Sequence, residues 1–213
     1  MILFLDTISP SPSFSIIDGN KIYYSIQIIK KKGNKISDSI IPTFLEIQKI
    51  IDIKKDISKL VVCTGPGSYT SLRIGVAFMY GLYESTQTPL IGVQCLDLLK
   101  LNIQKKNLNT TLIFISSMND QYFLSLPKNY KDIIKIDPLN ESNLLNKNIY
   151  NRYNSVISNY KIPKKILNSK KFEFNKIISF SEIIEKHYKK ILLLSNNYFI
   201  KPIYISENKI LSQ

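Results

Sequence analysis

The chain has 213 residues, of which 44% are hydrophobic and 21% are charged, a composition typical of a globular protein with one large domain or two small ones. No apolar run approaches the roughly 20 residues that a membrane-spanning helix needs, so we expect no membrane insertion. The formal net charge of +13 permits contact with nucleic acid without establishing it.

The positive charge comes almost entirely from lysine. Only Arg73 and Arg152 are arginine among the 29 cationic side chains. Arginine is the residue expected for bidentate phosphate contacts, whereas lysine, like the abundant isoleucine and asparagine, is encoded by A/T-rich codons. Two interpretations therefore stay open: the basic surface contacts nucleic acid, or it reflects the base composition of the genome.

The first 104 residues alternate between short apolar runs and turn signals. The hairpin turn Asp18-Gly19-Asn20 joins two predicted strands. The full set of predicted strands is 2–7, 13–18, 21–29, 60–64 and 90–93, and the predicted helices are 40–52, 69–85 and 95–101. This order predicts a mixed sheet flanked by helices, antiparallel at one edge and parallel elsewhere. It is the element order of a ribonuclease H-like, actin-like ATPase (ASKHA) half-domain.

The second half repeats this pattern less clearly. Strands are predicted over 111–116, 121–126, 132–136 and 201–206, a helix over 179–190, and asparagine-rich linkers over 140–154. The fold class is therefore α/β with two half-domains, 1–104 and a degenerate 105–213, whose last strand returns to the first half in one interpretation. The detailed fold of residues 127–178 is left open.

Few side chains have the chemistry of an independent enzyme. The only histidine is His187, which excludes an HExxH zinc site and leaves a Ser-His-Asp triad without support. The two cysteines, Cys63 and Cys95, lack metal-ligand spacing. We therefore predict no metal site and no bound cofactor for the chain alone. The N-terminus has no basic stretch before its apolar run, so no signal peptide is predicted and a cytoplasmic protein is expected.

A glycine-rich loop joins the strand at 60–64 to the helix at 69–85. Its residues are Gly65, Pro66, Gly67, Ser68, Tyr69 and Thr70. Ser68 or Thr70 can cap the helix, and free N–H groups at the helix start can hold an anion. No Gly-Lys-Ser/Thr follows, so the loop is not a P-loop. A tight structural turn is the alternative interpretation.

Two predicted helices carry more apolar surface than one sheet can cover. In the helix at 69–85 one apolar stripe can lie on the sheet, made by Leu72, Val76, Met79 and Tyr83. A second stripe, made by Ile74, Ala77, Phe78 and Gly81, needs another cover. The helix at 40–52 has the same two-sided character. We predict that this surplus forms a partner interface rather than intramolecular core only, made by Ile40, Ile41, Phe44, Leu45, Arg73, Ile74, Ala77, Phe78 and Gly81.

The segment Gly-Pro-Gly-Ser-Tyr-Thr-Ser-Leu-Arg-Ile-Gly at 65–75 resembles the GPGSFTGLRIG signature of the bacterial TsaB (YeaZ) family. Three further segments agree with that family: LFLDT at 3–7, LIGV at 90–93 and PIYI at 202–205. The family's Asp-Ala-Arg and its C-terminal arginine are absent, with Ser116-Ser117-Met118 and Ser206 at those places. The resemblance covers the first hundred residues well and the rest thinly.

The resemblance implies a non-catalytic subunit that supports threonylcarbamoyl transfer to the adenosine beside the anticodon of tRNA. Its implied partners are the catalytic paralogue TsaD and the ATPase TsaE, with tRNA bound through the complex and ATP or ADP at the complex interface. It also implies that the first two helices bind TsaD. When that partner is absent, we expect a homodimer through the same helices.

Asp6 and Thr7 stand where actin-like enzymes organise metal and phosphate, so they are a candidate vestigial nucleotide site. The next turn is Ser9-Pro10-Ser11-Pro12, and proline has no N–H to donate to phosphate. Two alternative functions stay open: an ATP-dependent phosphotransferase-like ASKHA enzyme, and a basic RNA-binding protein that acts alone.

Overall fold

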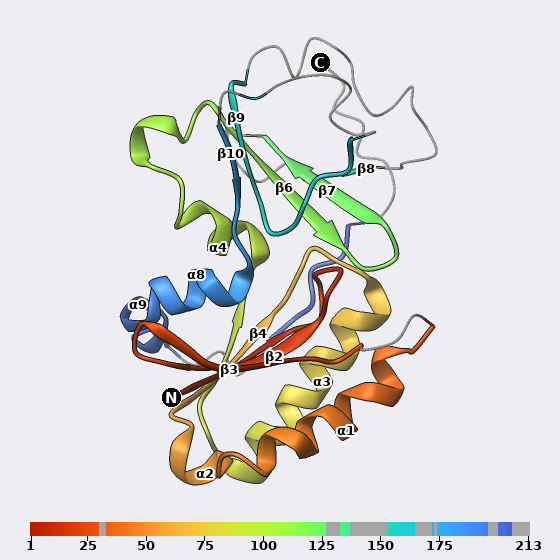
Figure 1. Ribbon diagram of the computed structural model, residues 1–213, viewed down its shortest axis with the longest axis vertical. Helices are drawn as coiled ribbons and strands as arrows, with labels where there is room; N and C mark the ends of the chain where they lie inside the picture. Colours follow the sequence, from red (N-terminus) through yellow and green to blue (C-terminus); the bar gives the residue numbers. More distant parts are fainter. Residues whose placement is uncertain are drawn as a thin grey trace.

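The computed structural model contains two five-stranded sheets with helices packed around them (Figure 1). It describes residues 1–29, 33–126, 133–136, 153–164, 172, 174–195 and 200–205. The predicted α/β class with two mixed sheets is confirmed.

The first sheet has the strand order β3-β2-β1-β4-β5. Its strands are β1 (Ile2–Asp6), β2 (Ser13–Asp18), β3 (Lys21–Gln27), β4 (Lys59–Cys63) and β5 (Leu90–Val93). The β1–β2 and β2–β3 pairs are antiparallel, and the β1–β4 and β4–β5 pairs are parallel. This is the mixed arrangement predicted from the element order, and the central strand β1 is buried on both faces.

Alternate residues of β1 belong to two different cores, as the two-residue period of a strand requires. Leu3 and Leu5 join the cluster beneath α1 (Ile36–Gln48) and α3 (Tyr69–Thr86). Ile2 and Phe4 join a cluster on the opposite face with residues of α4 (Cys95–Lys100) and α8 (Phe180–Lys186). Figure 1 shows α1 and α3 on one side of this sheet and α8 on the other.

The second sheet has the strand order β10-β9-β6-β7-β8. Its strands are β6 (Thr111–Ser117), β7 (Gln121–Ser125), β8 (Ile133–Ile136), β9 (Ser155–Ser158) and β10 (Phe174–Ile177). One face, through Ile113, Ile115 and Ile157, shares the core that contains Phe180 and Phe4. The two halves of the chain are therefore joined by a common apolar core around α8.

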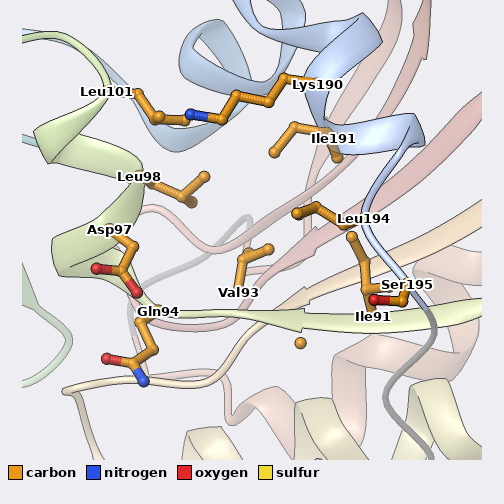
Figure 2. A pocket seen from close by; sticks show the side chains of 11 residues that line it. Ile91, Val93, Gln94, Asp97, Leu98, Leu101, Lys190, Ile191, Leu194 and Ser195 are labelled. Carbon is orange, nitrogen blue, oxygen red and sulfur yellow. The ribbon is translucent and has the colours of Figure 1, made fainter.

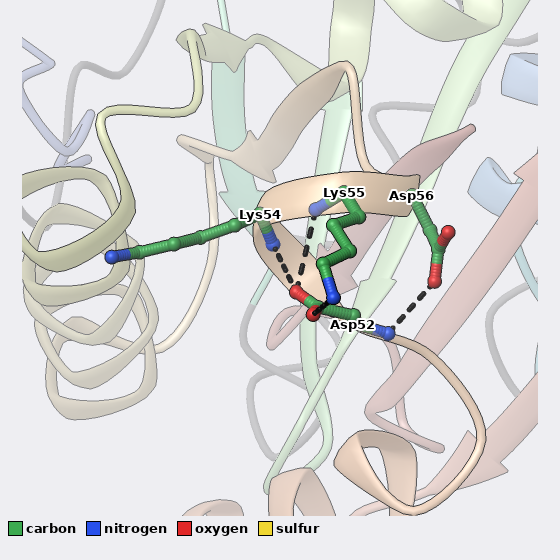
Figure 3. Close-up of polar contacts among 4 residues, drawn as sticks. All are labelled: Asp52, Lys54, Lys55 and Asp56. Carbon is green, nitrogen blue, oxygen red and sulfur yellow. Dashed lines mark hydrogen bonds and ion pairs between the residues drawn. The ribbon is translucent and has the colours of Figure 1, made fainter.

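Two short helical segments connect larger elements. In α2 (Ile53–Asp56), Asp52 caps the helix by accepting hydrogen bonds from the backbone N–H groups of Lys54 and Lys55, at 3.0 and 3.3 Å (Figure 3). The carboxylate of Asp56 accepts a hydrogen bond from the Asp52 N–H at 2.8 Å. The 3-10 helix η1 (Lys105–Asn107) lies between α4 and β6.

The structure corrects three predicted elements. The first helix begins at Ile36 rather than at residue 40, so Pro42 lies inside the helix and not in its first turn. The helix predicted over 179–190 is divided at His187 into α8 and α9 (Tyr188–Leu192), because His187 has non-helical φ and ψ of −111° and 24°. Residues 201–205 run alongside the first half without forming a strand, and most of the predicted linker at 140–154 lies outside the described residues.

Candidate functional site

The glycine-rich loop is enclosed by the chain's own C-terminal segment. Gly65 has a φ of +121°, and a Cβ at this position would lie 2.6 Å from the carbonyl oxygen of Ile203. The N–H of Ile203 donates to the carbonyl oxygen of Thr64 at 2.7 Å, and the N–H of Cys95 donates to that of Gly65 at 2.9 Å. Gly65 is therefore required by both its backbone conformation and the close passage of residue 203.

The other end of the loop contacts the second half of the chain. A Cβ on Gly67 would lie 3.1 Å from the side chain of Ile8 and 3.3 Å from Ser117 Oγ. The N–H of Ser68 donates to Ser117 Oγ at 3.2 Å. Ser68 is the N-cap residue of α3, but its side chain makes no capping hydrogen bond. The side-chain cap expected from Ser68 is thus absent, and its N–H binds a protein hydroxyl, which favours the structural interpretation of the loop.

Asp6 ends the first strand with its carboxylate turned into the protein. Its Oδ1 accepts hydrogen bonds from the N–H groups of Ile8 and Ser9 at 2.8 and 3.0 Å. The side chain is only 5% exposed. Burial raises the pKa of Asp6, although the hydrogen bonds from Ser9 and Ile8 act in the opposite direction. Its neighbour Thr7 is fully buried, with a hydroxyl that has no hydrogen-bond partner among the described residues.

An asparagine from the second half bonds to the loop that follows Asp6. The Asn159 side chain donates to Ser9 Oγ at 3.0 Å and to the carbonyl oxygen of Ser116 at 2.9 Å, and it accepts from the N–H of Ser116 at 2.8 Å. The N–H of Met118 also donates to the carbonyl oxygen of Ile8 at 2.9 Å. Sequence reasoning missed Asn159, because nothing in the sequence links it to a loop 150 residues away.

Only part of the predicted partner interface is exposed. Ile40 and Phe44 are 3% and 6% exposed and belong to the core beneath the helices. Phe44 packs between Phe14 of β2 and Phe78 of α3, with ring centroids 5.9 and 5.1 Å apart. Because Ile40 and Phe44 are buried, the structure does not support their predicted contact with a partner.

The remaining apolar residues form the outer surface of α1 and α3, which contact each other (Figure 1). Ile41 and Leu45 are 57% and 51% exposed. Ala77, Gly81 and Arg73 are exposed along α3, while Ile74 and Phe78 are half-buried. We call this surface the α1–α3 face, defined by Ile41, Leu45, Ile74, Ala77, Phe78 and Gly81.

Arg73 is placed at the edge of this face by an aromatic pair. Its guanidinium carbon lies 4.4 Å from the centroid of the Tyr69 ring, a cation–π distance. Tyr69 in turn packs against Tyr204, with ring centroids 4.5 Å apart. Both tyrosines remain about half exposed. The three side chains extend the α1–α3 face toward the C-terminal segment.

A separate cavity of about 410 Å³ lies between β5, α4 and α9 (Figure 2). Its walls are mainly apolar, from Val93, Leu98 and Ile191, with Asp97 and Lys190 at its edges. Asp97 is engaged by Lys100, whose Nζ lies 3.3 Å from its Oδ1. Sequence reasoning did not find this cavity, because its walls come from segments about a hundred residues apart.

Neither a metal site nor a membrane-spanning helix is found in the described parts of the chain. No group of three or more His, Cys, Asp or Glu side chains there could hold a metal ion. Within the same residues, none of the helices combines the length and the hydropathy that crossing a membrane requires.

Comparison with protein families gives a match to the model described as "TsaD: tRNA N6-adenosine threonylcarbamoyltransferase", over residues 20–191. The tRNA threonylcarbamoyladenosine biosynthesis protein TsaB of Bacillus subtilis is 46% identical over 48 residues. That match covers 22% of this chain and 21% of the length of the relative.

Solved structures agree over nearly the whole chain. YeaZ from Pseudomonas aeruginosa aligns with a TM-score of 0.56 and 11% identity, covering 96% of this chain and 99% of the other. A P. aeruginosa protein described as similar to peptidase YEAZ aligns with a TM-score of 0.61 and 10% identity, with the same coverage. At these identities the structures show a shared fold. Together, the comparisons confirm the resemblance to TsaB (YeaZ) predicted from residues 65–75.

Proposed function

Because the chain belongs to the family described as TsaD, tRNA N6-adenosine threonylcarbamoyltransferase, we propose that it acts in the biosynthesis of threonylcarbamoyladenosine in tRNA. In this proposal it is a subunit that does not catalyse the transfer itself. It binds and stabilises the catalytic paralogue TsaD, works with the ATPase TsaE, and acts in the cytoplasm.

The chemistry around Asp6 supports a role other than catalysis. A first-strand carboxylate that organised metal and phosphate would have to face an open site. The Asp6 carboxylate instead accepts hydrogen bonds from its own loop, at Ile8 and Ser9, and Asn159 bonds to the hydroxyl of Ser9. The single histidine, His187, cannot supply the two histidines of an HExxH zinc site.

The observation that carries the proposal is the α1–α3 face. Ile41 and Leu45 are more than half exposed on the outer side of a helix whose inner side already fills the core. Ala77 and Gly81 lie on the neighbouring helix, and a Cβ on Gly81 would meet no atom within 4 Å. Small residues beside exposed aliphatic ones allow another helix to approach closely and bury this surface.

Co-purification tests the proposed partnership. We expect the full chain, co-expressed with TsaD from the same cell, to elute with it as a stable complex. Depletion of the protein should remove threonylcarbamoyladenosine from tRNA, measured by nucleoside mass spectrometry. The proposal would be wrong if no complex formed and the modification persisted after depletion.

The isolated chain provides the test of catalysis. We expect no ATP hydrolysis and no threonylcarbamoyl transfer to a tRNA transcript without TsaD. Turnover of ATP that is lost in an Asp6→Asn variant would instead favour an ATP-dependent ASKHA enzyme.

A further inference from the structure

A second pocket, of about 380 Å³, lies between the segment that follows α4 and the edge strand β10. Its volume is within the range of about 300–1,000 Å³ found for ligand sites. It is lined by Asn102, Ile103, Gln104, Lys106, Asn107, Thr111, Ile157 and Lys176. We call it the basic pocket. Its wall strand β10 belongs to the second sheet and lies away from α1 and α2 (Figure 1).

Two cations enter the basic pocket from different parts of the fold. Lys106 belongs to η1 and is exposed. Lys176 is half-buried in β10, where it pairs in register with Ile157 of β9. A third cation, Lys186 of α8, donates a hydrogen bond to Asn102 Oδ1 at 3.3 Å, at the rim of the pocket. The described residues that line the pocket include no carboxylate.

Lys176 and Lys186 repel each other beside the basic pocket. Burial, and then the charge of Lys186, lower the pKa of Lys176. Burial, and then Lys186, Lys190 and Lys176, lower the pKa of His187. Like charges held close together cost free energy, which an anion between them would offset.

The ion pairs found among the described residues lie elsewhere. They join Lys49 to Glu46, Lys55 to Asp52 and Lys100 to Asp97. Each of these pairs spans three residues on one helix or its cap, whereas Lys106 and Lys176 are 70 positions apart. The paired lysines are thus explained by their spacing from an acidic residue nearby in the sequence. This spacing does not explain why Lys106 and Lys176 line the same pocket.

We propose that the basic pocket binds phosphate groups of an RNA backbone, with Lys106 and Lys176 as the contacting cations. Lys176, Lys186 and Lys190 all act electrostatically on His187, and several cations in one region suit a chain of phosphates better than a single one. Lysine, a flexible point charge, suits sequence-independent contacts of this kind. The choice of RNA rests on the proposed function in tRNA modification.

Fluorescence anisotropy with a labelled, unmodified tRNA transcript tests this inference on the full chain. The test variant is Lys106→Gln/Lys176→Gln. The control is Lys21→Gln/Lys54→Gln, which removes the same charge from exposed positions on β3 and α2. We expect the test variant to bind at least about fivefold more weakly than the control, and its plot of log affinity against log salt to be shallower by about two. Thermal melting of both variants verifies that they fold.

Equal affinity and equal salt dependence in the two variants would refute the inference, since the effect would then follow net charge only. Stronger binding to anionic phospholipid vesicles than to tRNA would refute it in favour of a membrane surface. Co-purification with TsaD is measured separately on the same variants. If no complex forms with any of them, the proposed function fails while the RNA result stands, so the two failures are distinguishable.

Discussion

The rings of Phe44 and Phe78 pack edge to face, with centroids 5.1 Å apart and planes inclined by 75°. Phe44 comes from α1 and Phe78 from α3, and Phe14 of β2 contacts both rings. This aromatic cluster fixes the two helices side by side above the sheet. The α1–α3 face can therefore present residues from both helices as one rigid surface, which lowers the entropic cost of binding a partner.

Replacing Phe44 by alanine should lower the free energy of unfolding by about 3 kcal/mol, because a buried ring leaves a cavity. Phe78→Ala should cost less, since Phe78 is only half-buried. The double variant should lose about 0.5–1.5 kcal/mol less than the sum of the two single losses, because the pair is broken only once. Urea denaturation followed by circular dichroism measures all four proteins. Strictly additive losses would show that the rings do not stabilise each other.

Leu45→Glu should weaken binding to TsaD by at least about tenfold, because it places a charge in the centre of an apolar contact. Leu45 is half exposed, so the free energy of unfolding should change by only about 0.5 kcal/mol. Leu193→Glu is the matched control, since Leu193 is 86% exposed at the end of α9. Isothermal titration calorimetry compares the two variants. Equal affinities would place the partner elsewhere on the molecule.

Helical periodicity predicts that α1 and α3 each carry apolar residues on two sides. It does not predict which side packs against the core and which side stays exposed. Of the stripe predicted to lie on the sheet, Leu72, Val76 and Met79 are buried, whereas Tyr83 is half-buried. Ile40 and Phe44 were placed at the partner interface, whereas they face the core. A single helix shows which residues share a face, while the crossing of two helices decides which face is covered.

The sequence pattern does not predict contacts between segments that are distant in the chain. Asn159 reaches Ser9, and Lys176 reaches the pocket of η1, without any local signal. The terminal strand was predicted from the apolar run at 201–206. Residues 201–205, the part of it that the structure describes, form no strand, although Ile203 donates one backbone hydrogen bond to Thr64. A strand needs a continuous ladder of such bonds, which composition alone does not predict.

Gly75→Ala should destabilise the fold by about 1–3 kcal/mol, the usual cost of overpacking a core. A Cβ at position 75 would lie 2.6 Å from Thr7 Oγ1 and 2.8 Å from Thr7 Cγ2, so α3 or Thr7 must move. Gly81→Ala is the control, because a Cβ there meets no atom within 4 Å, and it should stabilise the helix by about 0.5–1 kcal/mol. Thermal unfolding gives both values. Adding Thr7→Ala to Gly75→Ala should recover part of the loss, and an unchanged loss would contradict the role of Thr7.

The buried carboxylate of Asp6 makes folding sensitive to pH. Burial raises its pKa in the folded protein above the ordinary value of 3.8. Between 3.8 and the raised value, the folded state binds more protons than the unfolded state. The contribution of Asp6 to stability therefore falls as the pH rises through this window.

Asp6→Asn should remove this dependence while keeping an oxygen that accepts the N–H groups of Ile8 and Ser9. Relative to the natural protein, the variant should gain stability as the pH rises from 3 to 7, measured by urea unfolding at each pH. Asp52→Asn is the opposite control. Slight burial would raise the pKa of Asp52, but hydrogen bonds from Lys55 and Lys54 lower it, so this variant should lose relative stability over the same range. A relative loss for Asp6→Asn at neutral pH would contradict this prediction, because it would mean that the hydrogen bonds from Ser9 and Ile8 outweigh burial and stabilise the ionised carboxylate.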